Sequence, residues 1–281
     1  MKSILNNDIS AFTLFTMPAN RSQQRFALFI GAIIALITLL SVPFAQIELP
    51  RLNTTLPTLL GAMFCFEIFT VFIFYNQFRI GRSPQILVLC AGYFYSALMT
   101  LAYMLTFPGY FPPNIYRPGT QTAEYLYALW HAGFPVAILV FSAMSKWYAH
   151  VKLSRMQSLL ATIFATLGVI GIVVLFVYGV TVYERQLPLL MSFGYVTKLF
   201  NYAIALPILL LSLAALICYY RLTRGNTVTS IWLCVAILAT MLDVGITLCG
   251  GNRFSLGWYI SKFDSFIFAN IVLAACVTAV G

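Results

Sequence analysis

Charged residues are scarce in this sequence, since Lys, Arg, Asp and Glu together make up 8% of its 281 residues. Water-soluble domains carry about a quarter of their residues as charges. Hydrophobic residues make up 61% of the chain, and its mean hydropathy is +0.91. The shortage of charge therefore excludes a water-soluble fold and indicates a chain that lies in a lipid bilayer.

The residue patterns of catalytic and metal sites are also missing. The chain has two histidines, and its six cysteines form no CxxC pair, so neither a zinc site nor a disulfide framework is supported. HExxH, GxSxG and glycine-rich phosphate loops do not occur. The formal charge of +9 lies in short loops and forms no basic domain. We therefore expect no enzyme activity, metal, cofactor or nucleic-acid partner for these residues.

Long apolar runs are what the sequence does contain. Eight of them have about 20 residues, the length that crosses the hydrocarbon core of a bilayer. They are apolar on all sides, whereas the strands of a membrane barrel alternate. The sequence therefore predicts an all-α, polytopic membrane bundle of eight transmembrane helices. The predicted spans are 26–45, 56–75, 85–107, 122–144, 157–178, 199–219, 228–249 and 258–280.

The basic residues predict the orientation of these helices, because cytoplasmic loops are enriched in Lys and Arg. One side has ten basic residues and a single acid, Asp8, whereas the other has six, offset by Glu48, Glu124 and Glu184. We therefore expect both termini to be cytoplasmic. The ten residues are Lys2, Arg21, Arg25, Arg79, Arg82, Lys146, Lys152, Arg155, Arg221 and Arg224.

Two regions follow from this topology. Residues 1–25 form a cytoplasmic or interfacial segment, and residues 26–281 form one eight-helix membrane domain. No signal-peptidase site follows the first span, because the sequence VPFAQ at 42–46 lacks a small residue at the minus-three position. Four apolar residues of the first segment either form a short face on the inner membrane surface or belong to plain connecting chain. They are Ile9, Phe12, Phe15 and Met17.

Polar residues inside the spans are candidate functional residues, because ionisable groups are costly in a bilayer. Residues three or four apart share one face of a helix, and this spacing produces four polar stripes. They consist of Tyr93, Ser96, Thr100 and Tyr103; Glu124, Tyr127 and His131; Thr240, Asp243 and Thr247; and Ser261, Asp264 and Ser265. We expect the stripes to face the bundle interior, since unsatisfied polar groups in hydrocarbon are expensive. If they converge, they line a pocket that opens to the periplasm.

The predicted site combines these stripes with aromatic residues at the outer ends of the spans. Its ligand-contacting residues are Glu67, Tyr93, Tyr103, Trp130, His131, Asp243, Arg253, Trp258 and Asp264. Pro135 and Pro207 fall within spans and are candidate hinges, although prolines also kink helices without motion.

Two other interpretations of the same residues stay open. Polar side chains also hold membrane helices together, at about 1 kcal/mol for each hydrogen bond, and Lys262 either extends to the interface or pairs with Asp243 or Asp264. Buried acids are also what proton-coupled carriers use. A small proton- or solute-coupled transporter is therefore the alternative function.

Several local strings support a more specific interpretation. They are YNQF at 75–78, AGYFYSALM at 91–99, TFPGYF at 106–111, QTAEYLYALWHAGFP at 121–135 and NRFSLGWY at 252–259. In this order they resemble the fourth class of MASE domains, the bacterial membrane-associated sensors. The resemblance runs from about residue 18 to the C-terminal end.

The resemblance implies an input module of the bacterial inner membrane whose last helix is fused to a GGDEF diguanylate cyclase, the enzyme that makes cyclic-di-GMP. It also implies a homodimer, because a GGDEF active site forms between two such domains. The signal is an unidentified small or membrane-borne molecule. The chain has no GGDEF motif, so cyclase activity cannot belong to these residues. The apolar end at Gly281 favours a sensor part cut at a domain boundary; a natural truncation and a stand-alone module are the alternatives.

Overall fold

A computed structural model describes residues 17–52, 55–111, 119 and 121–280 of the chain. Its long helices are α2 (Arg21–Ser41), α3 (Thr55–Gly81), α4 (Pro84–Thr106), α5 (Thr122–Trp147), α6 (Arg155–Val182), α7 (Leu206–Thr223), α8 (Val228–Gly250) and α9 (Leu256–Val280). The shorter elements are η1 (Val42–Phe44), η2 (Glu184–Gln186), η3 (Phe200–Ala205), β1 (Met191–Ser192) and β2 (Tyr195–Val196). Of the candidate interfacial residues, Ile9, Phe12 and Phe15 lie outside the described residues.

The prediction of eight membrane-spanning helices is confirmed, since eight helices of the described residues are long and apolar enough to cross a bilayer. Some helices extend past the predicted spans, because polar residues continue the helical backbone hydrogen bonds there. α2 begins at Arg21, five residues earlier than predicted, and α3 continues to Gly81, six residues beyond residue 75. An apolar run marks the part of a helix inside hydrocarbon and leaves the ends undefined.

Side-chain caps fix several helix starts. Asn20 accepts a hydrogen bond from the backbone N–H of Gln23, whose side chain accepts one from the Asn20 N–H. Ser154 forms the same reciprocal capping box with Gln157 at the start of α6. Because a capping box satisfies two backbone donors that have no partner in the first helical turn, it sets where each helix begins.

The sixth span contains an element that we did not predict. Its first turns form a π-helix, η3, and the Leu206 N–H donates to the carbonyl of Asn201, five residues back. Pro207 follows directly and has no N–H to donate. A wide turn of this kind often marks a functional position, but the role of Pro207 as a hinge stays a prediction.

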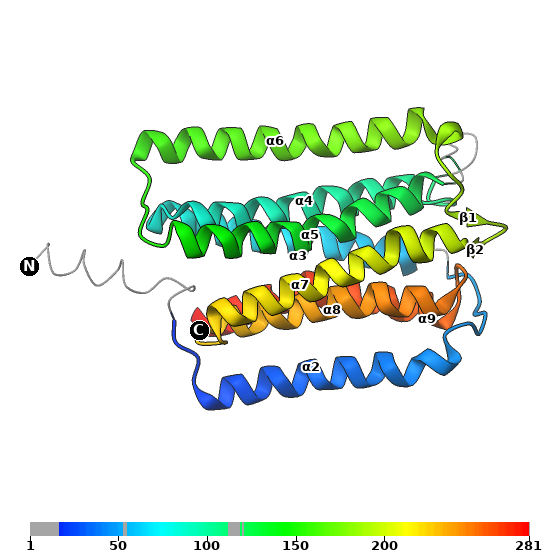
Figure 1. The fold of residues 1–281 in the computed structure, drawn as a ribbon, viewed down its shortest axis with the longest axis horizontal. Coiled ribbons are helices and arrows are strands. Elements are labelled where there is room, and N and C mark those ends of the chain that lie inside the picture. The colour runs from blue at the N-terminus through cyan, green and yellow to red at the C-terminus, as the bar shows by residue number, and fades with distance from the viewer. Residues whose placement is uncertain (1–16, 53–54, 112–118, 120, 281) are drawn as a thin grey trace, which may run out of the picture.

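Burial divides the bundle into a core and two edges. Half or more of the residues in the apolar windows of α4, α5, α8 and α9 are buried, against 6% in α6. Figure 1 shows α6 along one edge, beside α4 and α5, and α2 along the opposite edge, beside α8. α2 begins and α9 ends at the same end of the bundle (Figure 1). The assignment of that end to the cytoplasm stays a prediction.

At the opposite end of the bundle the loops contact one another. β1 and β2 form a short antiparallel hairpin, and Tyr195 pairs with Asn252 in the α8–α9 turn. The Gln121 side chain holds the hairpin at α5: its amide donates to the Met191 carbonyl at 2.7 Å, and its oxygen accepts from the N–H groups of Leu190 and Met191. The hairpin therefore has a fixed position over the ends of α5 and α8.

Two glycines of the resembling strings permit close packing. A Cβ on Gly133 would lie 2.0 Å from Cε1 of Tyr95, and a Cβ on Gly257 would lie 2.9 Å from Cβ of Ala45. Real carbon atoms do not approach so closely, so a larger residue would displace its neighbour. These motif glycines therefore fix the distances between α4 and α5 and between α9 and the η1 turn.

Candidate functional site

A buried hydrogen-bond network joins α5, α8 and α9 around Asp243. The Asp243 side chain is fully buried, and its Oδ2 lies 2.8 Å from Nε2 of His131. The hydroxyl of Tyr127 donates to Oδ1 at 2.8 Å, and the Ser265 hydroxyl donates to Oδ2. One carboxyl group on α8 therefore connects two side chains of α5 with one of α9.

The geometry also fixes the tautomer of His131. Its Nδ1 lies 2.9 Å from the Tyr127 carbonyl oxygen, and a carbonyl only accepts, so Nδ1 carries a hydrogen. Nε2 and the Asp243 carboxyl then share one proton. Wherever that proton lies, the net charge of the pair is zero, which makes it tolerable in a low-dielectric interior.

A second buried carboxyl group, Glu67 of α3, is linked to this network through Trp130. Ser96 and Thr100 of α4 donate hydrogen bonds to Glu67 at 2.5 Å and 3.1 Å. The indole N–H of Trp130 donates to the Ser96 oxygen at 2.7 Å. The Trp130 ring lies edge-on to His131, with centroids 4.5 Å apart. Hydrogen bonds therefore run from α3 through α4 to Trp130 of α5, and a ring contact joins Trp130 to His131 in the Asp243 network.

Lys262 of α9 lies in an aromatic cage instead of reaching the interface. The residue is 2% exposed, and its Nζ lies 4.4 Å from the ring centroid of Tyr127, 5.4 Å from Tyr103 and 6.0 Å from Trp258. The interfacial placement is therefore wrong. Among the described residues Lys262 makes no salt bridge with Asp243 or Asp264 either. A desolvated cation over such rings gains up to about 2 kcal/mol.

A small cavity of about 40 Å³, which we call the Lys262 cavity, lies beside this cage. A water molecule needs roughly 10–15 Å³, so the space admits two or three waters or a few atoms of a ligand. Arg253 pairs with Oε1 of Glu124 in its wall, while Glu124 Oε2 is buried without a hydrogen-bond partner among the described residues. The wall consists of Tyr103, Glu124, Tyr127, Met191, Val196, Phe200, Thr247, Gly250, Asn252, Arg253, Trp258 and Lys262.

These groups give the cavity a defined chemistry. Lys262 offers ammonium donors and the unpaired Glu124 oxygen offers an acceptor, while the remaining surface is mainly aromatic and aliphatic. A small polar molecule with both a donor and an acceptor matches this arrangement. A second space of about 10 Å³ beside His131 and Asp243 has the size of about one water molecule.

A comparison with known families agrees with the resemblance. Residues 50–280, which include α3 to α9 and every residue of the Asp243 network, match the family MASE4, described as a membrane-associated sensor, integral membrane domain. The chain belongs to the MASE4 family. It is therefore a multi-pass membrane sensor domain. No curated protein and no solved structure matches it.

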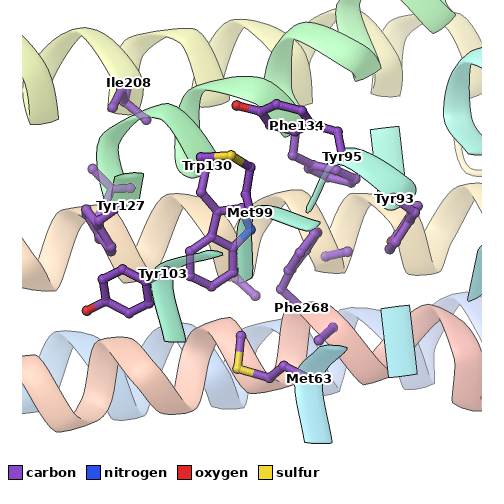
Figure 2. Close-up of a cluster of buried hydrophobic side chains, with 14 of the residues drawn as sticks. Met63, Tyr93, Tyr95, Met99, Tyr103, Tyr127, Trp130, Phe134, Ile208 and Phe268 are labelled. Carbon is purple, nitrogen blue, oxygen red and sulfur yellow. The ribbon is translucent and has the colours of Figure 1, made fainter. Parts of the chain in front are cut away.

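Most of the predicted site residues of this MASE4 domain lie together. His131 and Asp243 are in direct contact, and Trp130 and Glu67 are connected to them as described above. Figure 2 shows Tyr103 next to Trp130, with ring centroids 6.0 Å apart. Tyr103, Arg253 and Trp258 line the Lys262 cavity.

Two predicted residues of the MASE4 domain lie elsewhere. Asp264 accepts a hydrogen bond from Thr38 of α2 at 3.0 Å, on the side of α9 that faces α2. Tyr93 stacks on Phe268, with centroids 5.8 Å apart, and its hydroxyl has no hydrogen-bond partner among the described residues. Pro135 is buried in α5, four residues after His131. Because Pro135 has no N–H, it cannot make the usual helical bond to the His131 carbonyl.

Sequence reasoning missed two parts of the site. Lys262 was not predicted to contact ligand, although Trp258 precedes it by four residues and shares its helix face; the other two rings of its cage come from α4 and α5. The contacts of Glu48 in the loops beside the β1–β2 hairpin were also missed, because they join segments that are far apart in the sequence. Glu48 accepts hydrogen bonds from Tyr195 and Asn252, and the first of these raises the pKa of the Tyr195 hydroxyl above its ordinary value.

Proposed function

We propose that this MASE4 domain is the input part of a bacterial inner-membrane signalling protein and that it controls a GGDEF diguanylate cyclase joined after α9. One observation carries the proposal: the Asp243 network and the Lys262 cage both include a side chain of α9. α9 continues for fifteen residues beyond Ser265, to Val280, or about 22 Å at 1.5 Å per residue. A change at the site is therefore transmitted along a rigid rod to the far end of α9.

The mechanism is a shift between two packings of α9. A ligand in the Lys262 cavity forms hydrogen bonds with Lys262 and Glu124, and Lys262 then leaves its position over Tyr127. Removing a cation–π contact of about 2 kcal/mol changes an equilibrium by roughly 30-fold. If one packing of α9 is the minor state before the ligand binds, a shift of that size makes it the major state. α9 moves relative to α5 and α8 as a consequence.

Two serines of α9 provide the test. Ser265 donates to Asp243, whereas Ser261 donates only to the Trp258 carbonyl of its own helix. Both are buried. With the chain joined to its GGDEF domain, cellular cyclic-di-GMP is expected to change in Ser265→Ala and to stay at the wild-type level in Ser261→Ala. Equal output from both variants and the wild type, at equal amounts in the membrane, would contradict the proposal.

The two fully buried carboxyl groups, Glu67 and Asp243, favour a proton-coupled transporter as the second candidate. Reconstituted vesicles with a pH gradient distinguish the two functions. A carrier shows proton or solute flux that Asp243→Asn abolishes, whereas a sensor shows no flux above that of empty vesicles.

We also propose that the domain works as a homodimer, because two GGDEF domains must meet to form one active site. Step-counting photobleaching of a single-label variant in lipid nanodiscs tests this. Two bleaching steps per particle support the dimer, and single steps at all protein concentrations oppose it.

A further inference from the structure

The ends of α3 and α6 meet at the end of the bundle where α2 begins. Arg82, directly after α3, adopts a left-handed conformation with φ of 49°, and its carbonyl accepts a hydrogen bond from the Leu153 N–H at 3.0 Å. This contact places the α5–α6 loop beside the α3–α4 turn. Arg79 and Arg82 therefore lie close to Arg155, although more than 70 residues separate them from it in the sequence.

A cavity of about 720 Å³ lies between these helix ends, and we call it the α3–α6 groove. Three arginines are exposed at the groove, namely Arg79, Arg82 and Arg155, whereas Phe78 in its wall is almost fully buried. Leu159 and Thr162 continue its wall along α6. From residue 155 to residue 162 the groove follows α6 for about 10 Å, at 1.5 Å per residue.

The charge of the groove is uncompensated within the part of the chain that the structure describes. No carboxylate lines it, and none of the three arginines forms an ion pair with a described residue. A guanidinium group presents a planar fork of donors that matches two oxygens of a phosphate. Three such groups at one opening indicate an anionic phosphate ligand.

Apart from the hydroxyl groups of Tyr75, Ser158 and Thr162, the rest of the groove is apolar. The hydroxyl of Thr162 donates to the Ser158 carbonyl of its own helix, so it offers no free donor to a ligand. α6 buries only Val173 and Val180 against the bundle, and most of its other residues are exposed. In a membrane-spanning helix such residues contact lipid. A free phosphate ion would fill the opening and leave the apolar wall uncovered. A ligand with a phosphate group and an acyl chain covers both.

We propose that the α3–α6 groove binds an anionic phospholipid, with its phosphate between Arg79, Arg82 and Arg155 and one acyl chain along the exposed side chains of Met156 and Leu159. The groove lies at the end of the bundle that is predicted to be cytoplasmic, where basic pockets between membrane helices characteristically hold anionic headgroups. The site is separate from the Lys262 cavity, which lies at the opposite end of the bundle.

Native mass spectrometry of the purified chain with added phosphatidylglycerol tests this proposal. The triple variant Arg79→Gln, Arg82→Gln and Arg155→Gln is compared with a control triple variant that removes the same charge at the same end, Arg21→Gln, Arg221→Gln and Arg224→Gln. We expect a loss of affinity on the order of 100-fold in the first and less than about fivefold in the second, since each basic residue near a surface contributes about 1 kcal/mol.

Two further arms distinguish the ligand source and guard against misfolding. Phosphatidylcholine with the same acyl chains is expected to bind much more weakly, and inorganic phosphate is expected not to displace bound phosphatidylglycerol. The single variant Arg155→Gln, at the exposed start of α6, is expected to lose about fivefold in affinity with an unchanged circular dichroism spectrum. Equal retention of both lipids, displacement by phosphate, or equal losses in the two triple variants would overturn the proposal.

Discussion

The interaction energy of His131 with Asp243 can be separated from the effect of burying each side chain. This takes three variants: His131→Phe, Asp243→Leu and the double variant. The two substitutions keep the approximate volume and remove the polar atoms. His131→Phe leaves the Asp243 carboxyl buried with Tyr127 and Ser265 as donors. Asp243→Leu leaves His131 Nε2 and the Ser265 hydroxyl without their common partner and leaves Tyr127 with Thr247 alone, so it is expected to be the more destabilising change.

The magnitudes follow from the burial of the pair. Removing one partner of a buried ion pair costs about 3–5 kcal/mol, whereas replacing both by apolar residues is often close to neutral. We expect about 3 kcal/mol for His131→Phe, about 4 kcal/mol for Asp243→Leu and about 3 kcal/mol for the double variant, since Ser265 still lacks its acceptor and Tyr127 keeps only Thr247. The coupling energy is then about 4 kcal/mol in magnitude.

The assay is reversible unfolding by sodium dodecyl sulfate in mixed micelles, followed by circular dichroism. The pair Thr38 and Asp264 is the matched control, because one hydroxyl joins α2 to α9 there, at 3.0 Å and 3.3 Å from the two carboxyl oxygens of Asp264. Ordinary interhelical hydrogen bonds in membranes couple by about 0.6 kcal/mol on average and about 1.7 kcal/mol at most. A coupling for His131 and Asp243 no larger than that of Thr38→Val with Asp264→Leu would refute the shared-proton description.

Three further substitutions test other parts of the structure. Lys262→Met is expected to keep the fold, within about 1–2 kcal/mol in detergent unfolding, because it removes both a cation–π contact and the cost of a buried charge; the fused cyclase is expected to lose its regulation. Gly133→Ala is expected to destabilise by about 1–3 kcal/mol through overpacking, while Gly168→Ala on α6, where a Cβ meets nothing within 4 Å, is expected to be neutral or slightly stabilising. Gln121→Ala removes three hydrogen bonds to the β1–β2 hairpin, and amide hydrogen exchange at Leu190 and Met191 is expected to accelerate at least tenfold; unchanged exchange would show that other contacts hold the hairpin.

The eight spans were predictable because twenty apolar residues have few structural solutions in a bilayer. The polar stripes were also informative: His131 and Asp243 were placed on inward faces, and they meet. Their pairing was not predictable, because it depends on how α5 and α8 are rotated and shifted relative to each other. Spacing alone assigns a face and gives no distance between helices.

Asp264 shows a second limit of the sequence. It was grouped with Ser265, but neighbouring residues of a helix point about 100° apart, and the two side chains contact different helices. Ser265 reaches Asp243 of α8, and Asp264 reaches Thr38 of α2. Thr38 belonged to no predicted polar stripe, because only Ser41, three residues later at the end of α2, shares its helix face. Two hydroxyls are too short a pattern from which to infer a partner on another helix.

α2 has a consequence for how the protein enters the membrane. The family match begins at residue 50, after α2, and the matched part contains seven spans, an odd number. Seven crossings alone would leave residue 50 and the end of α9 on opposite faces of the bilayer. α2 adds the eighth crossing and makes the number even. Arg21 and Arg25 lie in its first turns. Because basic residues favour the cytoplasmic side, we expect α2 to set the direction in which the seven following helices are inserted.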